Sequence, residues 1–145
     1  MSKKELQRLF DSTPAKSYKD KVKQIEDYLI SIADGENIVG NGNELVYPDM
    51  WKYKHSFADG IYIREMHMKK GQLGFSAIHK HSYAFFLLSG VLAGSKEQGI
   101  EEFIAPCYII SPRGSKRIVY AVDGFWSNSS GCFCCYRYNG CNVCK

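Results

Sequence analysis

The chain has 145 residues and a formal net charge of +4, with 45% hydrophobic and 23% charged residues. This length predicts one domain with a core of its own, and the composition excludes an intrinsically disordered chain. The basic residues are scattered, a pattern that argues against nucleic-acid binding. The sequence has no apolar run long enough to span a membrane, and its start lacks the apolar core of a signal peptide, so we expect a cytoplasmic protein.

The first part of the chain predicts two helices. Residues 3–10 have a short helical pattern that ends near Asp11, and Thr13-Pro14 has the residue types of an N-cap and a first helical position. An amphipathic helix then runs to Gly35, with an apolar stripe formed by Tyr18, Val22, Ile25, Leu29 and Ile32. Such a stripe must be buried, either against the outside of a sheet or against a second copy of the chain.

From residue 61 the pattern changes to short strands separated by turn residues. We expect turns at Ser89-Gly90 and Asp123-Gly124, and strands over 61–68, 75–81, 84–88, 91–95, 101–105, 107–111 and 118–122. Strands of this length and spacing predict a mainly β fold, a small antiparallel β-barrel or jelly roll with an N-terminal α-helical arm. The expected divisions are a helical arm and linker over 1–43, the barrel over 44–130 and a cysteine-rich tail over 131–145.

Two histidines, His79 and His81, are the first candidates for a functional site. They are separated by one residue in a predicted strand, where side chains alternate between faces, so both imidazoles would point to the same side. This is a metal-ligand spacing for a strand, and it also suits the lining of a small polar pocket. Tyr83 would share that side.

The residues around this pair resemble the two motifs of the cupin superfamily. The first motif is matched by Gly74, His79, His81 and Gly90, and the second by residues 111–117, which begin Ser-Pro-Arg-Gly. Residues 55–65, 78–81 and 104–117, in this order, are similar to small cupin-like proteins encoded by tailed bacteriophages. The resemblance implies a jelly-roll barrel whose interior holds one divalent metal through two histidines, a carboxylate and a further histidine. In this chain positions 82–86 contain no carboxylate, and Arg117 stands where the last histidine is expected.

Two kinds of site follow from this departure. In the first, Glu65 or His67 from the preceding strand joins His79 and His81 in a three-ligand site for Fe, Mn, Zn or Ni. In the second, the histidines line a metal-free pocket with Tyr83 and Arg117, which suits a carboxylate or phosphate because arginine never deprotonates in proteins.

These sites lead to a prediction of ligand binding, either of a divalent metal or of a small anionic ligand. The first alternative is a metal-dependent oxygenase or isomerase, with Tyr83 as acid or base. The second is a non-catalytic structural or host-interaction protein of a phage. A homodimer is expected because aromatic residues are frequent in the predicted strands and open sheet edges need covering.

The end of the chain is rich in cysteine. Two C-x-x-C pairs could supply four thiolates to a structural zinc, namely Cys132, Cys135, Cys141 and Cys144. The five residues between the pairs are fewer than zinc sites of this type usually have. Free thiols are therefore the other interpretation.

Overall fold

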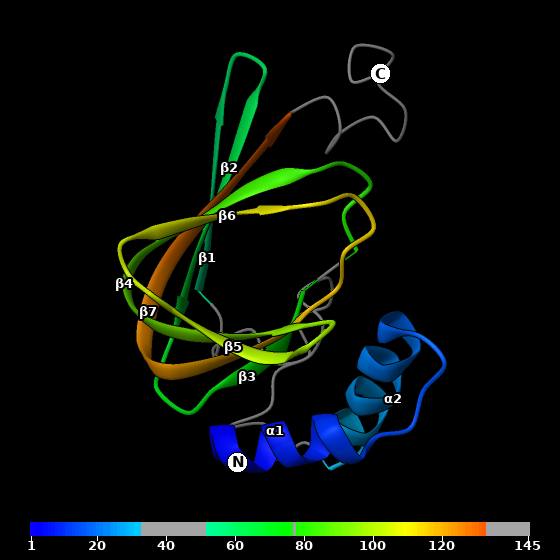
Figure 1. The fold of residues 1–145 in the computed structure, drawn as a ribbon. Helices are drawn as coiled ribbons and strands as arrows, with labels where there is room; N and C mark the ends of the chain where they lie inside the picture. Colours follow the sequence, from blue (N-terminus) through cyan, green and yellow to red (C-terminus); the bar gives the residue numbers. More distant parts are fainter. Residues whose placement is uncertain (33–51, 77, 133–145) are drawn as a thin grey trace.

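A computed structural model describes residues 1–32, 52–76 and 78–132, which form two helices and a seven-stranded sheet (Figure 1). The bounds of the elements are α1 Lys3–Ser12, α2 Tyr18–Ser31, β1 Lys52–Ala58, β2 Ile61–Met68, β3 Leu73–Phe75, β4 Tyr83–Lys96, β5 Gly99–Ile104, β6 Cys107–Ser111 and β7 Ile118–Cys132. No helix among these residues is long and apolar enough to cross a membrane.

The sheet is antiparallel and curls into a half-barrel. Its main path runs β1-β2-β7-β4-β5, with β3 paired to β7 and β6 paired to β4. Figure 1 shows the long strands β4 and β7 curving through most of the sheet, with both helices at one end. The predicted mainly β fold is confirmed.

Long curved strands replace two of the predicted turns. The chain continues through Ser89 and Gly90 as part of β4, where the pairing with β7 shifts register between Leu87 and Leu92. Gly90 has a φ of 84°, and irregularities of this kind bend a strand without ending it. The predicted hairpin at Asp123-Gly124 is also wrong, because β7 runs through it to Cys132.

The second helix begins later than the sequence predicted. The side chain of Ser17 caps α2 by accepting a hydrogen bond of 3.1 Å from the backbone N–H of Asp20. Thr13 instead closes α1, since its backbone N–H donates to the carbonyl of Leu9 at 3.1 Å. The prediction of Thr13-Pro14 as the helix start is therefore wrong, because the stronger local cap lies at Ser17.

Two apolar clusters cover the two faces of the curled sheet. The outer cluster joins the helices to the sheet and contains Leu6, Phe10, Val22, Ile25, Leu29, Leu73, Phe75, Ala93, Ile118 and Tyr120. The inner cluster lies on the concave side and contains Met68, Leu87, Leu92 and Ala121, with the partly buried Met66, Phe85, Phe103, Ala105, Cys107 and Val119 around it. Val22, Ile25 and Leu29 of the predicted stripe are thus buried against the outside of the sheet, as the first of the two predicted alternatives states. Ile32, which was predicted to continue the stripe, follows the end of α2 and is 48% exposed.

Candidate functional site

The histidine pair lies between strands. Strand β3 ends at Phe75 and β4 begins at Tyr83, so His79 and His81 are in the connecting segment, and the predicted strand over 75–81 is wrong beyond its first residue. Strand alternation therefore does not govern their side chains. His79 is half-buried and His81 is exposed.

His79 is held in a poorly solvated place beside Tyr83. The two ring centroids are 4.1 Å apart, and the Nε2 atom of His79 is buried without a hydrogen-bond partner among the described residues. Burial, together with the positive charge of Arg64, lowers the pKa of His79 to about 4. The imidazole is therefore neutral at pH 7, and it offers a hydrogen-bonding nitrogen without a charge.

Strand β2 places an arginine, and not a carboxylate, on the inner face. Met66 and Met68 belong to the inner cluster, so Arg64 shares their face and Glu65 and His67 lie on the opposite one. Glu65 forms an ion pair of 3.3 Å with Lys54 of the neighbouring strand β1.

The described donors do not form the metal set expected from cupins. Within residues 1–32, 52–76 and 78–132, no three His, Cys, Asp or Glu side chains lie close enough to hold an ion. The proposed third ligand, Glu65, lies on the outer face, and His67 is exposed. Metal binding by His79 and His81 stays a prediction from the sequence.

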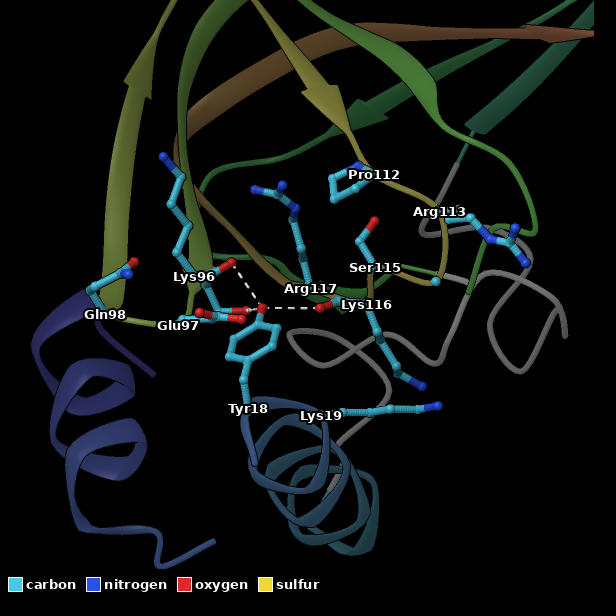
Figure 2. Close-up of a pocket in the computed structure, with 12 residues that line it drawn as sticks. Tyr18, Lys19, Lys96, Glu97, Gln98, Pro112, Arg113, Ser115, Lys116 and Arg117 are labelled. Carbon is cyan, nitrogen blue, oxygen red and sulfur yellow. Dashed lines mark hydrogen bonds between the residues drawn. The ribbon is translucent and has the colours of Figure 1, made fainter. Parts of the chain in front are cut away.

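A pocket of about 360 Å³ opens where the start of α2 meets the sheet (Figure 2). Its wall comes from three segments, which are Tyr18 and Lys19 of α2, residues 95–98 at the β4–β5 turn, and residues 112–117 between β6 and β7. In Figure 2 the side chains of Ser115 and Arg117 point away from α2, whereas Lys116 between them points toward it. Arg117 directly precedes β7, of which Val119 and Ala121 belong to the inner side.

Basic residues outnumber acidic ones in the wall of the pocket, which contains Lys19, Lys96, Arg113, Lys116 and Arg117 against Glu97. Two of these basic residues form ion pairs, Lys96 with Glu101 and Lys116 with the buried Glu26 of α2. Arg117 has a buried Nη1 atom with no hydrogen-bond partner in the described part of the chain. A guanidinium is always charged, so leaving one of its N–H groups buried and unpaired is costly.

Tyr18 lines this pocket and connects α2 to the sheet through hydrogen bonds of its hydroxyl. Its hydroxyl lies 3.0 Å from the carbonyl oxygen of Ser95, 2.8 Å from Ser95 Oγ and 3.0 Å from the carbonyl oxygen of Lys116. Ser95 Oγ also accepts a hydrogen bond of 2.9 Å from the backbone N–H of Ile118. Burial raises the pKa of Tyr18, which keeps the hydroxyl protonated as a donor.

Backbone bonds bring the His79 segment beside the Arg117 segment. Ser76 and Arg117 exchange two hydrogen bonds of 2.9 Å, and the N–H of Gly114 donates to the carbonyl of His79 at 2.8 Å. In the described residues, five buried side-chain N or O atoms have no partner, and three of them come from these two adjacent segments: His79 Nε2, Ser115 Oγ and Arg117 Nη1.

Sequence reasoning found part of this site. Three of the predicted residues belong to the two adjacent segments or contact them, namely His79, Arg117 and Tyr83, whose ring packs on His79. The other two, Glu65 and His67, lie on the opposite face of β2. Sequence reasoning missed Arg64, which strand alternation would have found once Met66 was recognised as inward-facing. Tyr18 had no local signal, because its role depends on a contact with Ser95, 77 residues away.

The predicted zinc ligands cannot be placed. Cys135, Cys141 and Cys144 lie outside the described residues, and Cys132 is described only as the last backbone position of β7. Zinc binding by the tail stays a prediction.

Comparison with solved structures identifies the fold. A cupin-family protein from Methanocaldococcus jannaschii with an RmlC-like double-stranded β-helix gives a TM-score of 0.53 at 7% identity, over 62% of this chain and 86% of that chain. An RmlC-like cupin from Shewanella frigidimarina gives 0.50 at 15% identity, over 57% and 76%. A cupin superfamily protein from Desulfitobacterium hafniense gives 0.50 at 10% identity, over 72% and 86%. No protein-family model matches the sequence, and no curated protein is similar to it. The chain therefore has the cupin jelly-roll fold.

Proposed function

We propose that this cupin-like protein binds a small organic anion, a carboxylate or phosphate ester, with Arg117 as the anchor of the anionic group. The observation that carries the proposal is the concentration of unpaired buried polar atoms on two adjacent segments, His79 Nε2, Ser115 Oγ and Arg117 Nη1. Buried polar groups in folded proteins are nearly always paired, so three unpaired atoms on two adjacent segments favour a ligand that pairs them.

The charge of the site favours an anion over a cation. Arg117 and Arg64 are permanently cationic, whereas His79, with a pKa of about 4, is neutral at pH 7. A guanidinium recognises the two oxygens of a carboxylate or phosphate in a bidentate manner. His79 Nε2 and Ser115 Oγ would then bond to polar groups of the same ligand.

The inner face of the half-barrel suits an apolar ligand body. Met66, Phe85, Phe103 and Val119 point to this side and remain only partly buried. Ligand sites commonly combine such apolar walls with a few placed polar groups.

Binding of acids and of their neutral amides tests the proposal. We expect carboxylic acids and phosphate monoesters to raise the melting temperature of the full chain, and the corresponding primary amides to leave it unchanged. In titration calorimetry, Arg117→Met should weaken binding of the best acid at least about tenfold, because a charge-assisted hydrogen bond is lost. Arg8→Met removes an exposed arginine of α1 and should bind like the wild type.

The stability of Arg117→Met separates loss of binding from loss of folding. Without ligand, this variant should be as stable as the wild type or more stable, because it removes a partly buried charge that lacks a full set of partners. Amides that bind as tightly as acids, or unchanged acid binding by Arg117→Met, would refute the proposal.

The metal prediction has its own test. Stoichiometric Fe, Mn, Zn or Ni in protein purified without a histidine tag, lost in a His79→Ala/His81→Ala variant, would support a metal centre and the oxygenase or isomerase alternative. Metal-free protein that still binds acids would favour the anion site. A phage origin and a host-interaction role rest on sequence resemblance alone.

A further inference from the structure

Side chains from three other segments hold the backbone around Arg117. The hydroxyl of Tyr18 in α2 lies 3.0 Å from the carbonyl oxygen of Lys116. Ser76 Oγ, directly after β3, accepts a hydrogen bond of 2.9 Å from the backbone N–H of Arg117. Ser95 Oγ of β4 accepts one of 2.9 Å from the N–H of the residue after Arg117. The peptide groups on both sides of Arg117 are therefore fixed by side chains that are distant in the sequence.

Helix α2 also holds the side chain of Lys116. The ammonium group pairs with Glu26, and both side chains are largely buried, with exposed fractions of 14% for Lys116 and 6% for Glu26. Tyr18 and Glu26 lie about two helical turns apart. The helix therefore contacts Lys116 at two points, the carbonyl oxygen and the ammonium group. Both contacts act on the residue that directly precedes Arg117.

These contacts set the direction of the Arg117 side chain. Figure 2 shows Lys116 pointing toward α2, whereas Ser115 and Arg117 point away from it. Neighbouring residues are joined by a planar peptide, so a rotation that turned Lys116 away from α2 would also turn Arg117. Arginine has a long side chain that loses conformational entropy when it is ordered by a ligand. A backbone that already aims this side chain reduces the cost of binding.

We propose that Tyr18 and Glu26 are positioning residues of the anion site, which hold Lys116 so that Arg117 is aimed at the anionic group. This positioning role rests on the function proposed above. Anion binding and the packing of α2 on the sheet are then coupled, and a coupling between two equilibria is reciprocal. Loosening α2 weakens anion binding, and a bound anion strengthens the packing of α2.

Titration calorimetry of single variants tests the positioning role. The probe is the carboxylic acid or phosphate monoester that raises the melting temperature of the wild-type chain most. Tyr18→Phe and Glu26→Gln should each raise the dissociation constant of this probe at least about fivefold, the lower end of typical couplings between sites. The matched controls Tyr28→Phe and Asp27→Asn change exposed residues of α2 and should bind the probe like the wild type.

Two further variants separate positioning from stability. Leu6→Ala removes buried packing from α1 and should bind the probe like the wild type, at a temperature where far-UV circular dichroism shows a folded chain. Glu26→Met/Lys116→Met removes both charges of the buried pair and should be more stable than Glu26→Gln. It should still bind the probe at least about fivefold more weakly than the wild type, because flexible methionine side chains do not fix the direction of residue 116.

Hydrogen exchange of the wild-type chain measures the reciprocal effect. The bound probe should slow the exchange of backbone amides in α2 as well as in residues 112–118. Exchange in α2 that is unchanged at a saturating concentration of the probe would overturn the coupling.

The variants also distinguish failure of the positioning role from failure of the proposed function. Wild-type affinity in folded Tyr18→Phe or Glu26→Gln would overturn the positioning role of that residue, and an equal loss of affinity in Leu6→Ala would show that affinity follows stability alone. Both results leave acid binding by the wild type and the role of Arg117 intact. A wild-type chain that binds no acid refutes the proposed function, and the positioning role with it.

Discussion

At the scale of single residues, His79 couples the site to pH. Its ring packs on Tyr83 at a centroid distance of 4.1 Å, and burial and Arg64 both favour the neutral form. A histidine that stays neutral in the folded state does not affect the free energy of unfolding at high pH. At lower pH the unfolded chain binds a proton that the folded chain does not, and the free energy of unfolding falls.

We predict that the free energy of unfolding falls as the pH is lowered from about 6.5 to about 4. The unfolded imidazole binds a proton near pH 6.5 and the folded one only near pH 4, so between these values the unfolded state binds more protons. The loss should be on the order of 2 kcal/mol, less than the full shift implies because part of the ring reaches solvent. Urea unfolding at several pH values measures it.

His79→Gln should flatten this pH profile, whereas His81→Gln, an exposed histidine of the same segment, should leave it as in the wild type. An identical slope in His79→Gln and the wild type would show that His79 is not the titrating group.

At the scale of secondary-structure elements, α2 holds the pocket together through two buried polar contacts. One joins the Tyr18 hydroxyl to Ser95 and Lys116, and the other joins Glu26 to the side chain of Lys116. Both contacts reach the segment that carries Arg117, so they connect helix packing to the site.

Tyr18→Phe should lower the free energy of unfolding by about 2 kcal/mol, because buried oxygens of Ser95 and Lys116 lose a partner. Tyr28→Phe removes the same hydroxyl from an exposed tyrosine of α2 and should change the free energy by less than about 0.5 kcal/mol. Denaturant unfolding measures both variants. Equal effects would show that the buried hydroxyl contributes nothing specific.

Glu26→Gln should lower the free energy of unfolding by about 3 kcal/mol. Glu26 is only 4% exposed, and its removal leaves Lys116 with an unpaired, mostly buried charge. The double variant Glu26→Met/Lys116→Met should regain most of this loss, since it removes both charges. Asp27→Asn breaks the exposed pair with Lys23 on the same helix and serves as the control, with an expected cost below about 0.5 kcal/mol. A Glu26→Gln variant as stable as Asp27→Asn would contradict this account.

At the scale of the whole molecule, one sheet supports two apolar clusters, one on each of its faces. The outer cluster ties α1 and α2 to strands β3, β4 and β7, and the inner cluster lies on the other face of the same sheet. Damage on either face should therefore weaken the entire fold.

We predict that Leu6→Ala in the outer cluster and Leu87→Ala in the inner cluster each lower the free energy of unfolding by about 2 to 5 kcal/mol, since both residues are fully buried. Each variant should unfold in a single transition, with helix circular dichroism and tyrosine fluorescence changing together. If the helical signal of Leu6→Ala is lost at a lower denaturant concentration than the fluorescence signal, the helices are a separate folding unit.

Sequence patterns determined those features that depend on neighbouring residues. The alternation over 61–68, the apolar stripe of α2 and the spacing of turn residues predicted a mainly β barrel or jelly roll with an N-terminal helical arm, because strand and helix periodicity are local properties. The motif residues His79 and Arg117 were also found, whereas Arg64 was missed.

Only the tertiary structure decided how these parts meet. The predicted strand over 75–81 ends at Phe75, so His79 is half-buried and His81 is exposed, and Glu65 lies on the outer face. The long-range contacts of Tyr18 with Ser95 and Lys116 shape the pocket. Each of these outcomes depends on which distant segments pack together, and the free energy of that packing outweighs the local preferences that a sequence displays.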